Sequence, residues 1–290
     1  MSDEKTRTGP DTATSGPGDL RTRLQRTRRR LARVERKLEN RTGQLERFQG
    51  ELEALRTFTL NVFPDLEFPE ALSERLTAIR EDHLTFLTGQ QLESLVSCVL
   101  ETEVSGREGI LVEAGTAQGG SAIAMALAKS PSRPLQVYDV FGLIPPPTDA
   151  DGPDVAKRYE KITAGQARGL AEDETYYGYR DDLLGEVTRS FARHGVPVED
   201  HRVSLVQGLF QDTLTGDEPV ALAHVDGDWY ESTMTCLSNL APRLVPGGRI
   251  VVDDYFTWSG CTRAVDEYFA DRPEFRVEMR AKVHVVRLPG

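Results

Sequence analysis

The chain has 290 residues, of which 39% are hydrophobic and 28% charged, and its formal net charge is −11. This composition is ordinary for a water-soluble protein with one large domain, and no apolar run approaches the ~20 residues of a membrane span. Three widely spaced cysteines (Cys98, Cys236 and Cys261) and a polar N-terminus unlike a signal peptide predict a cytoplasmic protein without disulfides.

The N-terminal part divides into a polar tail and a leucine-repeat segment. Residues 1–18 are rich in Gly, Pro, Ser and Thr, which predicts disorder. In residues 19–56 leucine recurs at every seventh position, which predicts a coiled coil and hence a homo-oligomer. An amphipathic helix packed on its own domain is the alternative. The repeated leucines are Leu24, Leu31, Leu38, Leu45 and Leu52.

The same segment is strongly basic. Residues 21–37 carry eight Arg, one Lys and one Glu, which give a local charge of +8. Because the net charge of the whole chain is −11, the remaining residues together carry −19. The arginines could contact phosphates, or they could form the solvent-facing side of the coil. Because the main body is acidic, we do not expect a nucleic acid as a partner.

Residues 57–105 are predicted to form a helical prelude to an α/β domain at 106–290. Thr88 can cap a helix that places Leu92, Leu95 and Val99 on one face. The α/β core begins at Ile110, where GILVEAGTAQGGSAIAMALAK reads as a buried strand, a Gly-rich turn and a helix.

The Gly-rich turn and the strand after it predict a nucleoside-containing cofactor. That strand ends at Asp139, 24 residues after Gly115, where an acid can bind ribose hydroxyls. Because the turn lacks the dinucleotide pattern G-x-G-x-x-G, S-adenosylmethionine (SAM) is favoured over NAD. Either Glu113 or the turn backbone would meet the amino-acid end of SAM. The cofactor candidates here are Glu113, Gly115, Thr116, Gly119, Gly120, Ser121 and Asp139.

Two further segments could contribute to a ligand site. A third strand, RVSLVQ, precedes Gly208 and Phe210, which could flank an adenine, although Phe210 could equally belong to the core. Residues 142–200 form a long insertion of the kind that serves as a lid or substrate loop. Its tyrosines at 176, 177 and 179 could line an acceptor pocket or pack the insertion onto the core.

Two apolar runs near the C-terminus each end in acids. ALAHV precedes Asp226 and Asp228, and RIVV precedes Asp253 and Asp254. The segment between the runs has helical spacing, and then comes the turn Pro246-Gly247-Gly248. Strand, helix and strand form a right-handed βαβ unit, so the acids converge at one edge of a parallel sheet. Carboxylates this close repel one another, and a hard cation relieves the repulsion.

Several of these stretches resemble the macrocin-type O-methyltransferases, which are metal-dependent class I SAM methyltransferases of antibiotic sugars. The matching stretches are VEAGTAQGGSA, YDVFGLIPPP, GLFQDTL, HVDGDWYESTMTCLSNLAPRLVPGGRIVVDDY and SGCTRAVDEYF. The resemblance spans roughly residues 85–280. It implies a Rossmann-like α/β sheet with helices on both faces, SAM and Mg²⁺ as cofactors, and Asp226, Asp253 and Asp254 as Mg²⁺ ligands.

The resemblance also implies the reaction, which is methyl transfer to a hydroxyl of a sugar or another hydroxylated natural-product intermediate. We expect Asp226 to accept the proton, with Asp228 and a residue of the insertion as rivals. The similar catechol O-methyltransferases have a lysine base three residues after the first metal acid, and Trp229 stands there in this chain. Two other functions stay open: a coiled-coil scaffold with a relic methyltransferase fold, and a nucleic-acid methyltransferase that uses the Arg-rich arm.

Overall fold

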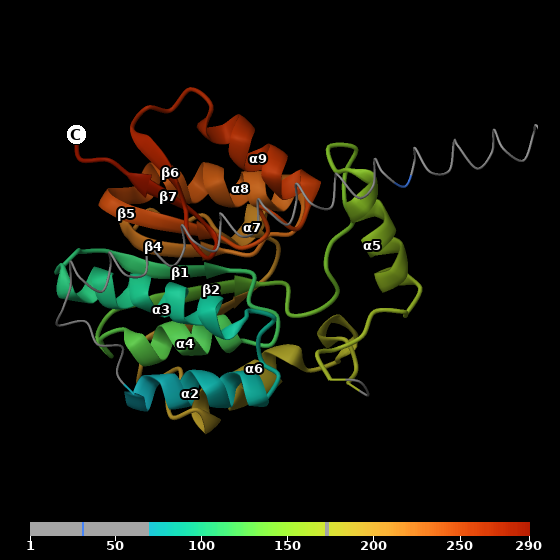
Figure 1. The fold of residues 1–290 in the computed structure, drawn as a ribbon. Coiled ribbons are helices and arrows are strands. Elements are labelled where there is room, and N and C mark those ends of the chain that lie inside the picture. Colours follow the sequence, from blue (N-terminus) through green and yellow to red (C-terminus); the bar gives the residue numbers. More distant parts are fainter. Residues whose placement is uncertain (1–30, 32–69, 172–173) are drawn as a thin grey trace, which may run out of the picture. The chain divides into compact units, whose positions relative to one another are not determined.

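The computed structural model describes residue 31 and residues 70–171 and 174–290 (Figure 1). The predicted tail at 1–18 lies outside these residues, as does the predicted coiled coil at 19–56 apart from Leu31. Both therefore stay predictions. The described residues from Glu70 onward belong to one compact unit. No helix among the described residues is long and apolar enough to cross a membrane.

The unit is built on a seven-stranded sheet with the order β3-β2-β1-β4-β5-β7-β6. All neighbours pair in parallel except β7, which runs antiparallel to β5 and to β6. This confirms the predicted Rossmann-like methyltransferase sheet, and the structure adds an antiparallel C-terminal strand to it. The strands are β1 (Ile110–Ala114), β2 (Leu135–Asp139), β3 (Val203–Gln207), β4 (Val220–Val225), β5 (Leu244–Val252), β6 (Phe275–Met279) and β7 (Val283–Arg287).

Helices cover both faces of the sheet, with α2, α3, α4 and α6 on one side and α8 and α9 on the other (Figure 1). Every residue of β1 and β4 is buried, as expected for parallel strands between two helical layers. The helices are α2 (Glu70–Glu81), α3 (Gly89–Val104), α4 (Gly120–Ala128), α5 (Pro153–Thr163), α6 (Leu183–Arg193), α7 (Phe210–Thr213), α8 (Tyr230–Leu240) and α9 (Ser259–Phe269), with 3₁₀ turns at Tyr177–Tyr179 and Ala241–Arg243.

Local signals in the sequence explain several element boundaries. Thr88 caps α3 as predicted, in a reciprocal capping box with Gln91. The predicted turn Pro246-Gly247-Gly248 instead falls within the bounds of β5, where the register with β4 shifts between Val220 and Leu222. β5 therefore begins before the Pro-Gly-Gly signal, because these residues form an irregularity within the strand rather than a turn that precedes it.

The register of the central strands places three loops together. Ala114 at the end of β1 pairs with Val225 at the end of β4, which in turn pairs with Val252 at the end of β5. The Gly-rich turn, the Asp226 loop and the Asp253–Asp254 pair therefore leave the sheet at one edge, where open α/β sheets bind ligands.

The segment predicted as a single insertion, about 142–200, consists of two different parts. Its second part contains α6, whose Leu183, Val187 and Phe191 belong to the hydrophobic core under the sheet. Its first part contains α5 and the tyrosines and forms a small cluster of its own around Ile162 and Tyr176. Only the first part stands outside the two helical layers (Figure 1).

Candidate active site

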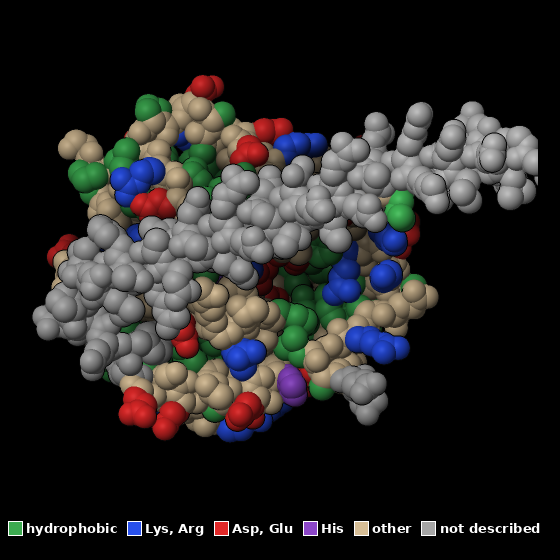
Figure 2. Space-filling model, in the orientation of Figure 1, with side chains coloured by type: hydrophobic (Ala, Val, Ile, Leu, Met, Phe, Trp, Pro, Cys, Tyr) green, Lys and Arg blue, Asp and Glu red, His purple; other side chains and the backbone are tan. Residues whose placement is uncertain are grey.

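A cleft of about 580 Å³ lies at the edge of the sheet where the three loops meet. It is large enough for a cofactor or a drug-sized ligand. The face shown in Figure 2 is hollowed near its middle, with acidic side chains in the depth and Lys and Arg side chains along the right-hand rim. The lining combines predicted cofactor residues with predicted metal acids: Gly115, Asp139, Phe210, Asp226 and Asp228.

Glycines shape the turn after β1 by allowing other segments to approach it closely. Gly115 has a φ of +88°, and a Cβ there would lie 2.0 Å from the carbonyl oxygen of Asp226. A Cβ on Gly120 would lie 2.4 Å from the carbonyl oxygen of Leu84, which accepts a hydrogen bond from the Gly120 N–H at 2.9 Å. Gly119 has a φ of +91° at the start of α4. The turn needs these glycines for packing against protein, and this brings it directly against the Asp226 loop.

Asp139 organises the same turn. One of its oxygens accepts hydrogen bonds from the backbone N–H groups of Thr116 (2.7 Å) and Ala117 (3.0 Å), and the other accepts from Phe141 N (2.7 Å). Burial raises the pKa of this carboxyl, and the backbone donors oppose the shift. Each carboxylate oxygen has two lone-pair sites, so one site remains, on the oxygen that accepts from Phe141. Because Asp139 lines the cleft, this site can accept from a ribose hydroxyl.

Glu113 lies behind the turn rather than in the cleft. Its side chain is fully buried, accepts a hydrogen bond from Ser121 Oγ, and lies 3.2 Å from Nδ1 of His224. Of the two groups expected to meet the amino-acid end of SAM, the turn backbone therefore faces the cleft and Glu113 does not. Gly208, with a φ of +149°, follows β3 and donates its N–H to Asp139 O, and Phe210 after it lines the cleft.

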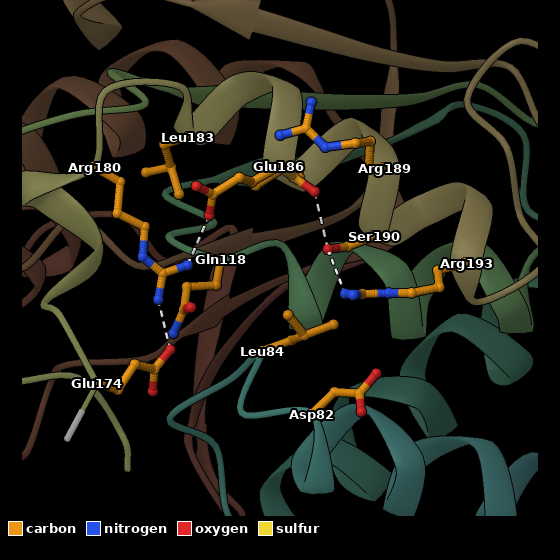
Figure 3. A pocket seen from close by; sticks show the side chains of 11 residues that line it. Asp82, Leu84, Gln118, Glu174, Arg180, Leu183, Glu186, Arg189, Ser190 and Arg193 are labelled. Carbon is orange, nitrogen blue, oxygen red and sulfur yellow. Dashed lines mark hydrogen bonds and ion pairs between the residues drawn. The ribbon is translucent and has the colours of Figure 1, made fainter. Parts of the chain in front are cut away.

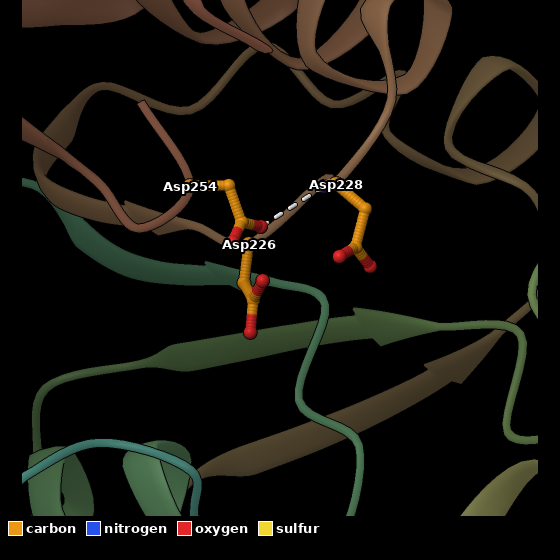
Figure 4. Close-up of side chains that lie close together, drawn as sticks. All are labelled: Asp226, Asp228 and Asp254. Atoms are coloured by element: carbon orange, nitrogen blue, oxygen red, sulfur yellow. Dashed lines mark hydrogen bonds between the residues drawn. The ribbon is translucent and has the colours of Figure 1, made fainter. Parts of the chain in front are cut away.

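Three carboxylates gather where these loops meet, and two of them, Asp226 and Asp228, line the cleft. Figure 4 shows the three side chains. Asp226, Asp228 and Asp254 each offer an oxygen, and these oxygens all lie within 4.8 Å of one another. The backbone N–H of Asp228 donates to Asp254 at 3.2 Å. Burial, and then the charge of the neighbouring carboxylates, raises the pKa of all three groups. We call Asp226, Asp228 and Asp254 the acidic cluster.

The structure does not bring Asp253 into the acidic cluster. Its Oδ1 lies 2.9 Å from Nζ of Lys282 and 3.5 Å from Nε2 of His224. Burial raises the pKa of Asp253, but His224 and Lys282 outweigh it and the net shift is downward. Burial also opposes protonation of His224, yet Glu113 and Asp253 raise its pKa to about 10.

His224 and Lys282 were not among the candidates from the sequence. His224 had a usable signal, because it stands two residues before Asp226 in a strand that is otherwise apolar. Lys282 had none, because it reaches the site from the connection between β6 and β7, at the far end of the chain.

Two tryptophans support the acidic cluster. Nε1 of Trp258 donates a hydrogen bond to Oδ1 of Asp228 at 2.9 Å, and the ring of Trp258 packs edge-on against Trp229 with centroids 5.6 Å apart. Trp229 is 2% exposed and donates its Nε1–H to the carbonyl oxygen of Pro145 at 2.9 Å. Asp228 itself has a φ of +53°, a strained value for a residue with a side chain.

The first part of the insertion is tied to the same loops by two more aspartates. Asp151 accepts from the backbone N–H of Tyr230, the first residue of α8, at 2.8 Å. Asp154 accepts from both the backbone N–H and the hydroxyl of Ser259, the first residue of α9. These carboxylates satisfy free N–H groups at the starts of two helices.

The tyrosines of the insertion have different positions. Tyr177 lines the cleft, where its environment includes the charges of Asp228 and Asp139. Tyr176 is 2% exposed, and the hydroxyl of Tyr179 donates to the carbonyl oxygen of Ile162. Tyr177 therefore meets the site, whereas the other two pack the insertion together.

A second cavity, of about 510 Å³, lies between α6 and the loop after α2. Arg180 in this cavity forms ion pairs with Glu174 at 2.5 Å and with Glu186 at 2.8 Å (Figure 3). The cavity is lined by three acids and three arginines, so its charges balance, and it has less of the character of a ligand site than the cleft. The acids are Asp82, Glu174 and Glu186, and the arginines are Arg180, Arg189 and Arg193.

Comparisons with known proteins agree with this geometry. The family model described as Macrocin-O-methyltransferase (TylF) matches residues 77–279. A Streptomyces olivaceus 8-demethyl-8-(2,3-dimethoxy-alpha-L-rhamnosyl)-tetracenomycin-C 4'-O-methyltransferase is 31% identical over 74% of this chain and 77% of that protein. The mycinamicin III 3''-O-methyltransferase of Micromonospora griseorubida is 32% identical over 63% of this chain and 69% of that protein. The solved structure of the O-methyltransferase NovP has a TM-score of 0.59 and 28% identity, over 71% of this chain and 83% of that one.

Proposed function

Because the chain belongs to the macrocin O-methyltransferase (TylF) family and is therefore a SAM-dependent O-methyltransferase, we propose that it methylates a hydroxyl of a sugar or another hydroxylated natural-product intermediate, with Mg²⁺ at the acidic cluster. The observation that carries this proposal is the group of three mutually repelling carboxylates, two of which line the cleft together with Gly115 of the Gly-rich turn.

The residues around the cleft fit SAM. The backbone of the turn at Gly115 and Ala117 is open to the cleft, and Asp139 offers one free acceptor site for a ribose hydroxyl. Phe210, which also lines the cleft, provides an apolar surface for adenine. SAM supplies an already activated methyl group, so these residues have to hold the cofactor in position rather than activate it.

The acidic cluster fits a hard divalent cation, because its donors are carboxylate oxygens and its own charges repel. Asp226 and Asp254 would hold Mg²⁺ together with Asp253, whose Oδ1 lies against Lys282 and His224 in the structure. When bound there, Mg²⁺ acts as a Lewis acid that lowers the pKa of a nearby hydroxyl.

We place the general base at Asp228 rather than at Asp226. A carboxylate that holds a cation is a weak proton acceptor, and Asp226 would be such a carboxylate. Asp228 has one oxygen fixed by the indole N–H of Trp258, which leaves the other oxygen for the acceptor's proton. The proton of the acceptor hydroxyl would pass to Asp228 as the oxygen takes the methyl group, and breaking of the methyl–sulfur bond would leave S-adenosylhomocysteine. Tyr177, on the cleft wall near Asp228, would contact the acceptor.

The curated relatives support a hydroxylated small molecule as the acceptor, since their names describe methylation of a rhamnosyl-tetracenomycin and of mycinamicin III. The alternative of a relic fold that only recruits partners is disfavoured, because the carboxylates are kept together at a cost in repulsion. The Arg-rich arm of the nucleic-acid alternative lies outside the described residues.

The test is methyl transfer from labelled SAM to a panel of glycosides that includes mycinamicin III and 8-demethyl-8-(2,3-dimethoxy-alpha-L-rhamnosyl)-tetracenomycin C, with Mg²⁺ or with EDTA. We expect transfer that requires Mg²⁺ and falls roughly 10²- to 10⁴-fold in Asp228→Asn. Asp271→Asn, which alters an exposed acid at the end of α9, serves as the control. Transfer that is undiminished in EDTA contradicts the magnesium proposal, and full activity of Asp228→Asn contradicts the assignment of the base.

A further inference from the structure

Lys282 binds Asp253 at two points. Its Nζ lies 2.9 Å from Oδ1 of the Asp253 carboxylate and donates to the Asp253 carbonyl oxygen, also at 2.9 Å. Both side chains are largely buried, at 13% and 14% exposure. Burial and the charge of Asp253 raise the pKa of Asp254, and the charge of Lys282 opposes this rise. The ammonium group of Lys282 therefore interacts with two of the acids that would hold the divalent cation.

Asp253 has a second cationic neighbour, His224, but that residue is held in place. Its other ring nitrogen contacts Glu113, its partner across β1 and β4, and its side chain is 1% exposed. Lys282 differs because it stands on the connection between β6 and β7 and carries a flexible four-carbon side chain. Of the two cations beside Asp253, Lys282 is the one that can withdraw.

Lys282 does not take the role of the lysine base of the catechol O-methyltransferases, at whose position this chain has Trp229. Neither Lys282 nor Asp253 is among the described residues that line the cleft, so the ammonium does not stand where the acceptor would bind. A charge in that position acts on the acids rather than on the acceptor hydroxyl.

We propose that Lys282 is a built-in counter-ion that occupies Asp253 in the metal-free enzyme and competes with the divalent cation for that carboxylate. This inference rests on the proposed magnesium site. Binding of Mg²⁺ displaces the ammonium from Oδ1 of Asp253. Lys282 thereby neutralises a buried carboxylate in the metal-free protein and weakens the affinity of the site for the metal.

The experiment measures Mg²⁺ binding to the full chain by calorimetry, with S-adenosylhomocysteine affinity as the check on folding. We expect Lys282→Met to bind Mg²⁺ at least about tenfold more tightly than the unaltered chain, because the metal no longer displaces a paired ammonium. Lys282→Gln, which keeps a polar end, serves as a second variant and should shift the affinity in the same direction.

Arg280→Met is the matched control for long-range charge. Arg280 precedes Lys282 by two residues but pairs with Glu101 at 3.5 Å and Glu278 at 3.4 Å. We expect its removal to change Mg²⁺ affinity less than about threefold, since it does not touch the acids. An equal gain in Arg280→Met, or equal or weaker binding by the folded Lys282 variants, overturns the inference. If the unaltered chain and the Lys282 variants all fail to bind Mg²⁺, the magnesium site itself is refuted and the inference falls with it.

Discussion

Asp226 and Asp253 are expected to respond in opposite directions to the same isosteric change. Asp226 lies among like charges, whereas Asp253 lies between two cations. Replacing Asp226 by Asn removes repulsion and keeps an amide that can donate to Asp254. Replacing Asp253 by Asn leaves Lys282 and His224 without their carboxylate.

The cluster geometry gives the size of the effect. Two unit charges 4.8 Å apart interact by about 3.5 kcal/mol at an effective dielectric constant of ~20. Proton uptake limits the repulsion, because protonating a carboxyl of ordinary pKa (~3.9) at neutral pH costs about 4 kcal/mol. We therefore expect Asp226→Asn to stabilise the metal-free protein by about 2–4 kcal/mol, which raises its Tm by roughly 5–15 °C. Asp253→Asn should destabilise it by about 3–5 kcal/mol.

The assay is calorimetric unfolding of both variants and the unaltered chain in EDTA near neutral pH, repeated with Mg²⁺. Added Mg²⁺ should stabilise the unaltered chain and have little effect on Asp226→Asn, which lacks a ligand. A lower Tm for Asp226→Asn in EDTA would refute the reasoning, because it would mean that the acidic cluster is not under electrostatic strain in the metal-free protein.

Three further predictions follow from the same contacts. Gly115→Ala should destabilise the protein by about 1–3 kcal/mol and weaken S-adenosylhomocysteine binding, because the new Cβ would collide with the carbonyl oxygen of Asp226. Denaturant unfolding measures the first effect and calorimetry the second, and a variant unchanged in both contradicts the packing role of the glycine. Trp258→Phe should lower kcat by about tenfold with little change in SAM affinity, since it removes only the donor to Asp228, and a loss confined to SAM binding contradicts this. The pKa values of Asp226, Asp228 and His224 are higher in the folded than in the unfolded state, so the folded protein binds more protons. The free energy of unfolding in EDTA should therefore fall as the pH rises from about 6 to about 9. Urea midpoints measure this change, and a rise over the same interval contradicts the shifts.

The sequence predicted the elements whose signals are local. Buried five- to six-residue strands, the Thr88 cap and the βαβ unit around Asp226 depend on residues close together in the chain, and the structure confirms them. Convergence of acids at one sheet edge also followed, because strand direction and crossover handedness decide it.

The sequence did not predict which acid contacts which cation. Asp253 and Asp254 are adjacent, so no spacing rule distinguishes them, yet one pairs with Lys282 and the other joins the acidic cluster. That difference depends on the rotation of each side chain and on a lysine 29 residues away in sequence. The same holds for the glycines. The Gly-rich pattern predicted a turn after β1, but it did not predict which protein atoms lie against that turn.

The contacts of Asp151 and Asp154 have a consequence for changing the acceptor. These two residues belong to the insertion, yet they cap α8 and α9, the helices that follow the loops carrying the acidic cluster. An exchange of this insertion between relatives would therefore disturb the helices beneath the cation site unless the graft retained both aspartates. Variation of the insertion around Tyr177, with Asp151 and Asp154 held constant, is the route that separates a change of acceptor from damage to the reaction centre.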